Sequence, residues 1–218
     1  MRVYHFVNEV HGLEDLRRRR LKVATLKELN DPFELFGVNL ADQSLRLAFQ
    51  EMKEQLATTR GLLCFSKNWS NPVQWSHYAG KHTGLCLGFD IPDELLSPVS
   101  YSRRRLVVAA ESFQKPDQID LETATRFLFT KYSHWRYENE VRCFVTLKDK
   151  DPESGLYFAN FSDTLRLATV VVGAQSKISR ETLRQALGDL MPRVTALKAR
   201  LAFNTFKVVT QRNAKLWT

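Results

Sequence analysis

Short apolar runs of strand length recur along the whole chain, and segments of helical periodicity lie between them at irregular intervals. Residues 3–7 alternate, so that Val3, His5 and Val7 share one face of the expected strand while Tyr4 and Phe6 share the other. Residues 44–56 instead repeat apolar side chains at the spacing of an amphipathic helix. Strands and helices that mix without strict β-α-β alternation are typical of an α+β fold.

Further elements follow from the same two periodicities. We expect more strands at residues 21–24, 62–66, 84–89, 138–147, 169–173 and 203–209, and more helices at residues 13–20 and 121–133. Asn71 is the expected N-cap of a helix that begins at Pro72 and ends at Gly80, and Ser179 is the expected N-cap of another. No repeat or linker divides the chain, so residues 1–218 are predicted to form a single domain.

Composition limits where such a chain works. No run of about 18 apolar residues is present, and the N-terminus lacks the apolar stretch of a signal peptide, so we expect a cytoplasmic protein without a membrane partner. The three cysteines, Cys64, Cys86 and Cys143, lie far apart in apolar runs and are predicted to be buried and reduced. The net charge of +8 favours an acidic partner such as nucleic acid or a nucleotide.

Two basic runs, at residues 17–20 and 103–105, are candidates for phosphate contacts. A helix turns once every 3.6 residues, so four consecutive arginines cannot all face solvent while the helix continues. Neither run contains the interleaved aromatic side chains of a single-strand binding platform. A solvated surface and a phosphate contact therefore both remain open for them.

An acidic pair close to an aromatic segment carries the clearest chemical signal. If residues 138–147 form a strand, Glu138, Glu140 and Arg142 point to the same side, with about 6.5–7 Å between successive members. When two carboxylates lie so near to each other, the pKa of one of them is raised. An arginine beside them lowers the pKa of both, so the two glutamates can take different roles. The alternative is a solvated strand face held by ion pairs.

Polar and aromatic residues elsewhere are weaker candidates. Ser66 ends an otherwise apolar strand, where its hydroxyl can contact a ligand or cap a turn. Trp75 and Tyr78 share one face of the helix after Pro72, where core packing is the alternative to ligand stacking. His5 fits either a core position or a ligand contact. We predict no metal site, because the candidate ligands Asn30, Asp31 and Glu34 have no further acidic or histidine cluster near them in sequence.

Taken in order, five blocks of this sequence resemble the bacterial family known as domain of unknown function 2971. The blocks are Val-Tyr-His-Phe from residue 3, Asn-Asp-Pro-Phe-Glu from residue 30, Cys-Phe-Ser-Lys from residue 64, Trp-Ser-His-Tyr-Ala from residue 75 with residues 84–90, and Trp-Arg-Tyr-Glu-Asn-Glu-Val-Arg from residue 135. They extend from the start of the chain to about residue 145. The family name implies no activity.

The order of a strand histidine, a Phe-Ser strand and a late Glu-x-Glu strand is also distantly similar to ADP-ribosyltransferases. That likeness implies a mixed, mostly antiparallel split sheet flanked by helices, and NAD as a substrate. By position, Glu140 would be catalytic and Glu138 would orient or deprotonate the acceptor. The expected NAD contacts are His5 or Tyr4 at the nucleotide, Ser66 at the nicotinamide pocket, Tyr78 or Trp75 stacked on nicotinamide, and Arg17 or Arg142 at the pyrophosphate. The middle-strand motif is Phe-Ser-Lys rather than the fuller Ser-Thr-Ser of many transferases.

Three functional hypotheses follow from these features. The first is an ADP-ribosyltransferase, such as a bacterial toxin or phage-defence effector, that modifies nucleic acid or protein and has an antitoxin or regulatory partner. The second is a basic nucleic-acid-binding or nuclease-like module without NAD chemistry. The third is a non-catalytic interaction domain in which Glu138, Glu140 and Arg142 form a structural ion-pair ladder.

Overall fold

A computed structural model describes residues 1–31, 33, 37–107, 126 and 129–217. The elements in chain order are β1 (Arg2–Val7), α1 (Glu9–Arg18), β2 (Arg20–Thr25), α2 (Gln43–Thr59), β3 (Arg60–Ser66), α3 (Pro72–Tyr78), β4 (Leu85–Asp90), η1 (Asp93–Leu95), β5 (Ser97–Pro98), β6 (Ser100–Ser102), β7 (Thr130–Tyr132), η4 (Ser133–Glu138), β8 (Glu140–Thr146), β9 (Tyr157–Asn160), β10 (Arg166–Val172), α5 (Arg180–Leu187), η5 (Gly188–Arg193), β11 (Thr195–Leu201), β12 (Val208–Thr210) and η6 (Ala214–Leu216). The η elements are short 3₁₀ helices.

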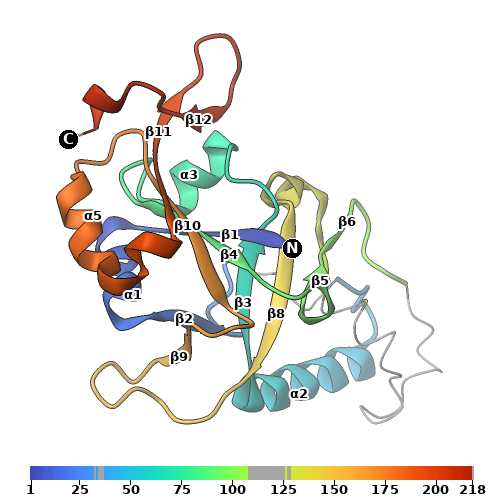
Figure 1. The fold of residues 1–218 in the computed structure, drawn as a ribbon. Coiled ribbons are helices and arrows are strands. Elements are labelled where there is room, and N and C mark those ends of the chain that lie inside the picture. Colours follow the sequence, from blue (N-terminus) through green and yellow to red (C-terminus); the bar gives the residue numbers. More distant parts are fainter. Residues whose placement is uncertain (32, 34–36, 108–125, 127–128, 218) are drawn as a thin grey trace.

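One mixed sheet with flanking helices organises this part of the chain, which confirms the α+β prediction (Figure 1). Its order in the described residues is β12-β11-β10-β4-β1-β3-β2-β9, and β8 joins β3 and β5. Within this sheet β10 and β11 are parallel, while the other pairs are antiparallel. A separate parallel pair joins β6 to β7. None of the helices in the described ranges has the length and apolarity to span a bilayer.

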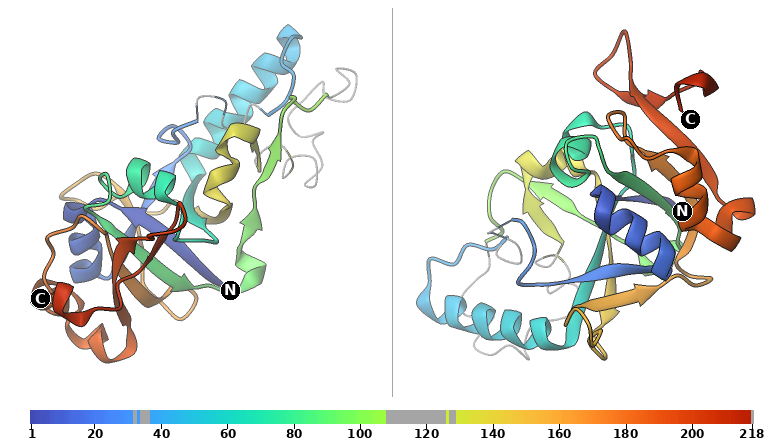
Figure 2. Two further views of the ribbon diagram at one scale, coloured as in Figure 1. Left: turned by 90° about the horizontal axis from the view of Figure 1, so that it is seen from above. Right: turned by 90° about the vertical axis from the view of Figure 1, so that its left-hand side faces the viewer.

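The pairing of β3 is what opens a space near the middle of the sheet. One edge of β3 pairs with β8 along its full length, from Arg60 to Ser66. The other edge pairs with β1 at Ser66, opposite Tyr4, and with β2 at Gly61 and Leu62. Between these two ends the described residues provide no strand partner on that edge. β1 and β2 therefore pair with opposite ends of β3, and Figure 2 gives two further views of the sheet.

Apolar clusters cover both faces of β1, and the structure places Val3 and Val7 on one face and Tyr4 and Phe6 on the other, as their alternation predicts. Val3 and Val7 belong to the largest cluster, to which α1 and α5 contribute Leu16 and Leu183. Tyr4 and Phe6 pack from the other side of β1 against the apolar cluster around Trp75 of α3. Burial from both sides fixes the register of β1, and with it the direction in which its side chains point.

The two predicted N-caps are confirmed. The Asn71 Oδ1 accepts from the Val73 nitrogen at 2.9 Å at the start of α3, and the Ser179 hydroxyl accepts from the Thr182 nitrogen at 3.0 Å at the start of α5. The strand predicted at residues 203–209 was wrong, and the helix predicted at residues 121–133 was wrong at its end. Residues 203–209 are not one strand, because β11 and β12 form a hairpin with a loop at residues 202–207. The predicted helix at 121–133 lies mostly outside the described residues, and its end is β7 and the start of η4.

Replacing Gly84 by alanine is expected to destabilise the sheet by about 2–3 kcal/mol, because overpacking a close backbone contact costs that order of free energy. A Cβ at this position would lie 2.2 Å from the Val7 carbonyl oxygen, where β1 ends beside β4. Urea unfolding measures the loss. Gly155→Ala is the comparison: a Cβ there meets nothing within 4 Å, and only its φ of +68° opposes the change, at about 1 kcal/mol. Equal losses in the two variants would contradict the packing argument.

Asp15 on α1 makes the stability depend on pH, because burial raises its pKa to about 7. A folded-state pKa above the unfolded value contributes stability below about pH 4 that is lost as the pH rises through 7. Asp15→Asn is expected to be more stable than the parent by about 2–4 kcal/mol at pH 8, and to lose that advantage by pH 4. Urea unfolding at both pH values measures the difference. The same pH dependence in the exposed control Asp163→Asn would contradict the assignment to Asp15.

Candidate active site

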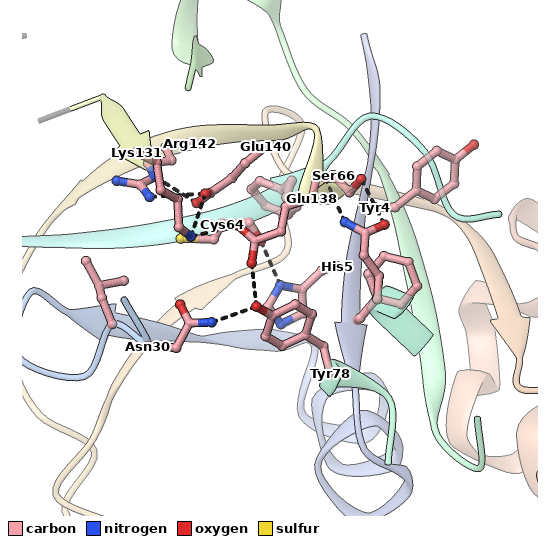
Figure 3. Close-up of a pocket in the computed structure, with 14 residues that line it drawn as sticks. Tyr4, His5, Asn30, Cys64, Ser66, Tyr78, Lys131, Glu138, Glu140 and Arg142 are labelled. Carbon is pink, nitrogen blue, oxygen red and sulfur yellow. Dashed lines mark hydrogen bonds and ion pairs between the residues drawn. The ribbon is translucent and has the colours of Figure 1, made fainter. Parts of the chain in front are cut away.

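A pocket opens where β1 and β3 separate, and it holds most of the residues predicted to form a site (Figure 3). It has a volume of about 130 Å³. The residues that line it come from β1, β3, α3, β7, η4, β8 and the segment after β2: Tyr4, His5, Phe6, Leu29, Asn30, Cys64, Phe65, Ser66, Gln74, Tyr78, Lys131, Glu138, Glu140 and Arg142. Of the eight predicted site residues, seven are in this set and Trp75 is outside it.

Glu140 is held by a two-point contact with Arg142. Both lie on β8 two residues apart, so their side chains project to the same side of the strand. The Arg142 Nε lies 2.7 Å from Oε1 of Glu140, and its Nη2 lies 3.1 Å from Oε2. Burial by itself would raise the pKa of Glu140, but the guanidinium and a nearby lysine hold it below its usual range. Glu140 is therefore an ionised carboxylate in a buried site.

Lys131 on β7 joins the two glutamates, as Figure 3 shows. Its Nζ lies 2.7 Å from Oε2 of Glu138 and 3.3 Å from Oε2 of Glu140, and its side chain is only 3% exposed. The Nζ also lies 4.7 Å from the centre of the Trp135 ring. Two carboxylates and two cations thus form a buried cluster without net charge when both acids are ionised. Buried ions need such compensation, because an unpaired charge in the interior is costly.

Glu138 lies in a different local structure from the one predicted. It ends the 3₁₀ helix η4, and Asn139 follows with φ 45° and ψ 51° before β8 begins at Glu140. This left-handed turn, which asparagine adopts more readily than most residues, brings both carboxylates onto Lys131 instead of placing them along one strand face. The prediction that Glu138 belongs to the strand was wrong, while the prediction that the two carboxylates are close is confirmed.

The second oxygen of Glu138 accepts a short hydrogen bond from the Tyr78 hydroxyl. The Asn30 Nδ2 donates to that same hydroxyl oxygen at 2.6 Å, and the Gln74 Nε2 donates to the backbone carbonyl of Glu138 at 2.7 Å. Burial raises the pKa of Glu138, and Lys131 offsets only part of that effect. Glu140 and Glu138 therefore differ in the direction of their pKa shifts, although they share a lysine.

His5 and Ser66 complete the polar lining on β1 and β3. The His5 Nδ1 lies 3.0 Å from the Cys64 carbonyl oxygen, and because a carbonyl only accepts, Nδ1 carries the proton. Burial lowers the pKa of His5, so the ring is neutral and its Nε2 is an acceptor. The Ser66 hydroxyl donates to the Asn68 carbonyl oxygen at 2.9 Å and accepts from the Asn68 nitrogen at 3.1 Å, so it also shapes the turn after β3.

Trp75 does not line the pocket, so its predicted stacking role requires correction. Its side chain is completely buried, its ring meets Phe6 edge-on at 5.3 Å, and its Nε1 donates to the Trp69 carbonyl oxygen at 2.6 Å. α3 directs Trp75 into the core and Tyr78 towards the pocket. Core packing, the alternative named for Trp75 from sequence, is what the structure contains.

The two arginines predicted to contact pyrophosphate are also placed differently. Arg142 is 1% exposed and its guanidinium is occupied by Glu140, while Arg17 is an exposed residue of α1 outside the pocket. The run at residues 17–20 is largely paired within the molecule, since Arg19 contacts Asp189 and Arg20 contacts Asp151. Residues 103–105 line a second pocket that shares Lys131 with the first.

For a metal, the described residues contain no group of three or more histidine, cysteine or acidic side chains that could hold an ion. Asp31 is buried and its Oδ1 accepts from the Phe33 nitrogen at 2.9 Å, and Asn30 contacts Tyr78 in the pocket. Glu34, the third candidate, lies outside the described residues.

Sequence reasoning missed Lys131, Asn30 and Gln74 as pocket residues. Lys131 lies inside a stretch that was predicted to be a helix. Its local sequence offers only a basic residue near the apolar Phe129, which does not indicate a site. Gln74 lies on the same face of α3 as Tyr78, but helical spacing alone does not indicate which group Gln74 contacts. These three residues can be assigned to the pocket only from the fold, which brings α3, β7 and the segment after β2 together.

Comparison with family models, with curated proteins and with solved structures found no match for this chain.

Proposed function

We propose that the pocket binds the nicotinamide end of NAD and that the protein is an ADP-ribosyltransferase. The observation that carries the proposal is the convergence of His5, Ser66, Tyr78 and the two glutamates on one pocket. These residues come from β1, β3, α3, η4 and β8, and a concave pocket with a few convergent polar groups is the usual form of a small-molecule site. The pattern of β1, β3 and β8 as neighbouring strands also fits the distant likeness drawn from the sequence.

The reaction assigns different work to the two acids. The bond between the ribose C1′ and the nicotinamide nitrogen breaks, its electron pair leaves with nicotinamide, and C1′ develops positive charge as in glycoside cleavage. The ionised carboxylate of Glu140 stabilises that charge. The acceptor then forms a bond to C1′ and gives its proton to Glu138, whose raised pKa favours taking it.

The remaining pocket residues bind and orient. The neutral His5 presents Nε2 as an acceptor for a ribose hydroxyl, and Tyr78 fixes Glu138 through its hydrogen bond. A volume of about 130 Å³ equals roughly ten water-sized spaces, which suits the nicotinamide and part of its ribose. The phosphates would then lie outside, towards the arginines of the second pocket beside Lys131.

The test measures nicotinamide release and label transfer together. Protein is incubated with NAD labelled in its adenylate, and with protein, DNA and RNA acceptors in separate tubes. Free nicotinamide is quantified by chromatography, and labelled acceptors are separated on gels. We expect release that depends on the protein and label on one acceptor class. No release above that of a heat-treated sample, with any acceptor, would overturn the proposal.

One observation also favours the non-catalytic alternative. The cluster of Lys131, Glu138, Glu140 and Arg142 has ion pairs for all four members, as a structural network requires. The two functions differ in what they predict for NAD: an ion-pair ladder needs no NAD, and its disruption changes stability alone.

A further inference from the structure

The hairpin of β11 and β12 projects from the body of the molecule, at the end of the sheet away from β9 (Figure 1). Its loop exposes two large aromatic side chains: Phe203 is 93% exposed and Phe206 is 99% exposed. Burying a phenylalanine is favourable, so two rings that stay almost fully exposed on one loop are candidates for contact with another molecule.

The charge around this loop has one sign. From residue 190 to residue 218 the sequence contains no aspartate or glutamate and six lysines and arginines, at positions 193, 198, 200, 207, 212 and 215. Lys198 is buried and its Nζ donates to the carbonyl oxygens of Gly173 and Ser176, whereas Lys207 and Arg212 are exposed. The hairpin therefore presents cations without local carboxylates, unlike the arginine run at residues 17–20.

A groove runs between this hairpin and the segment that follows β3. The Val208 nitrogen donates to the Ser70 carbonyl oxygen at 2.8 Å and fixes the two segments side by side. The groove has a volume of about 710 Å³, and its lining combines cations, aromatic rings and short polar side chains, among them Trp69, Ser70, Arg200, Phe203, Thr210 and Arg212. The guanidinium carbon of Arg200 lies 4.5 Å from the centre of the Phe203 ring.

We propose that this hairpin and groove bind single-stranded nucleic acid. Exposed rings accept stacked bases of any sequence, and cations beside them contact the backbone phosphates. A paired duplex hides the base faces that Phe203 and Phe206 would contact. An anionic lipid surface is the other polyanion to consider, but the polar Asn204 and Thr205 separate the two phenylalanines, and the concave polar groove fits a strand better than a bilayer. This inference rests on the hairpin alone and does not require NAD in the pocket.

The test is fluorescence anisotropy of a labelled 20-nucleotide oligothymidine with the full chain, run from low to moderate salt. Phe203→Ala/Phe206→Ala is expected to weaken binding about tenfold or more at constant charge. Arg200→Gln/Lys207→Gln/Arg212→Gln is expected to make the dependence of log K on log salt shallower by about 2. The matched control Arg17→Gln/Lys27→Gln/Lys148→Gln removes the same charge elsewhere and should change affinity less than about threefold.

Four results would overturn the proposal. The first is an equal loss in the control and in the hairpin variants, which would mean that net charge alone drives binding. The second is unchanged affinity in the phenylalanine variant. The third is tighter binding to a 20-base-pair duplex. The fourth is retention on vesicles of phosphatidylcholine and phosphatidylserine in a 7:3 ratio without binding to the oligonucleotide. Wild-type nicotinamide release is measured on the same samples, so a failure here is separable from a failure of the NAD proposal.

Discussion

Glu140→Gln is expected to lower nicotinamide release from NAD by about a hundredfold to a thousandfold, because it removes the fixed charge proposed to stabilise the positive ribose. Glutamine keeps the size of the side chain but removes the carboxylate that Arg142 and Lys131 keep ionised in the parent protein. The measurement is the initial rate of release at saturating NAD, compared with the parent protein.

The same substitution leaves Arg142 buried with a weaker partner, so its effect on folding has to be separated from its effect on the reaction. Far-UV circular dichroism and thermal unfolding establish the folded fraction at the assay temperature, and rates are expressed per folded molecule. Glu138→Gln is also expected to lower the rate of nicotinamide release, because it removes the proposed proton acceptor. The exposed Glu94→Gln is the matched control and should retain the parental rate. Parental rates in both Glu140→Gln and Glu138→Gln would contradict the catalytic assignment.

Lys131→Met is expected to destabilise the protein by about 3–5 kcal/mol at pH 8, because it removes one buried cation from between two carboxylates. The double variant Lys131→Met/Glu138→Gln restores the balance of one carboxylate and one guanidinium. We expect it to recover at least half of the lost unfolding free energy. Urea unfolding of the parent, both single variants and the double variant gives the coupling energy. Losses that simply add would contradict the buried cluster.

The pH dependence of Lys131→Met has a defined sign. Burial raises the pKa of Glu138 and Lys131 lowers it, so removing the lysine raises the folded-state pKa further. A folded-state pKa above the unfolded value gives stability that is complete at low pH and is lost as the pH rises through it. The destabilisation should therefore be smaller at pH 5 than at pH 8. The opposite order would contradict the pKa argument.

Local signals predicted several parts of this fold correctly. Asn71 before a proline and Ser179 before a helical pattern mark real helix starts, because a cap depends on neighbours within three residues. The alternation of residues 3–7 also identifies the two faces of β1, since both faces are covered by apolar clusters. Such features need no knowledge of the remainder of the chain.

Features that depend on distant segments were missed or misplaced. Lys131 belongs to the site because β7 lies beside η4 and β8, and no pattern within its own segment indicates a carboxylate partner. Asn139 adopts a left-handed conformation and turns the chain between the two glutamates. Strand periodicity contains no signal for such a turn. The hairpin of β11 and β12 was not predicted, because the apolar Phe203 and Phe206 favoured a strand at residues 203–209. The structure exposes both side chains on a loop.

The most direct test of the central claim is thermal unfolding with and without NAD. A ligand at about 100 times its Kd raises the unfolding free energy by about 2.7 kcal/mol, which for a chain of this size is roughly 5–10 °C in Tm. The account predicts a rise of that order with NAD in the parent protein, and a smaller rise in Tyr78→Ala, which loses a pocket side chain and the hydrogen bond to Glu138. An unchanged Tm of the folded parent protein at millimolar NAD would contradict it.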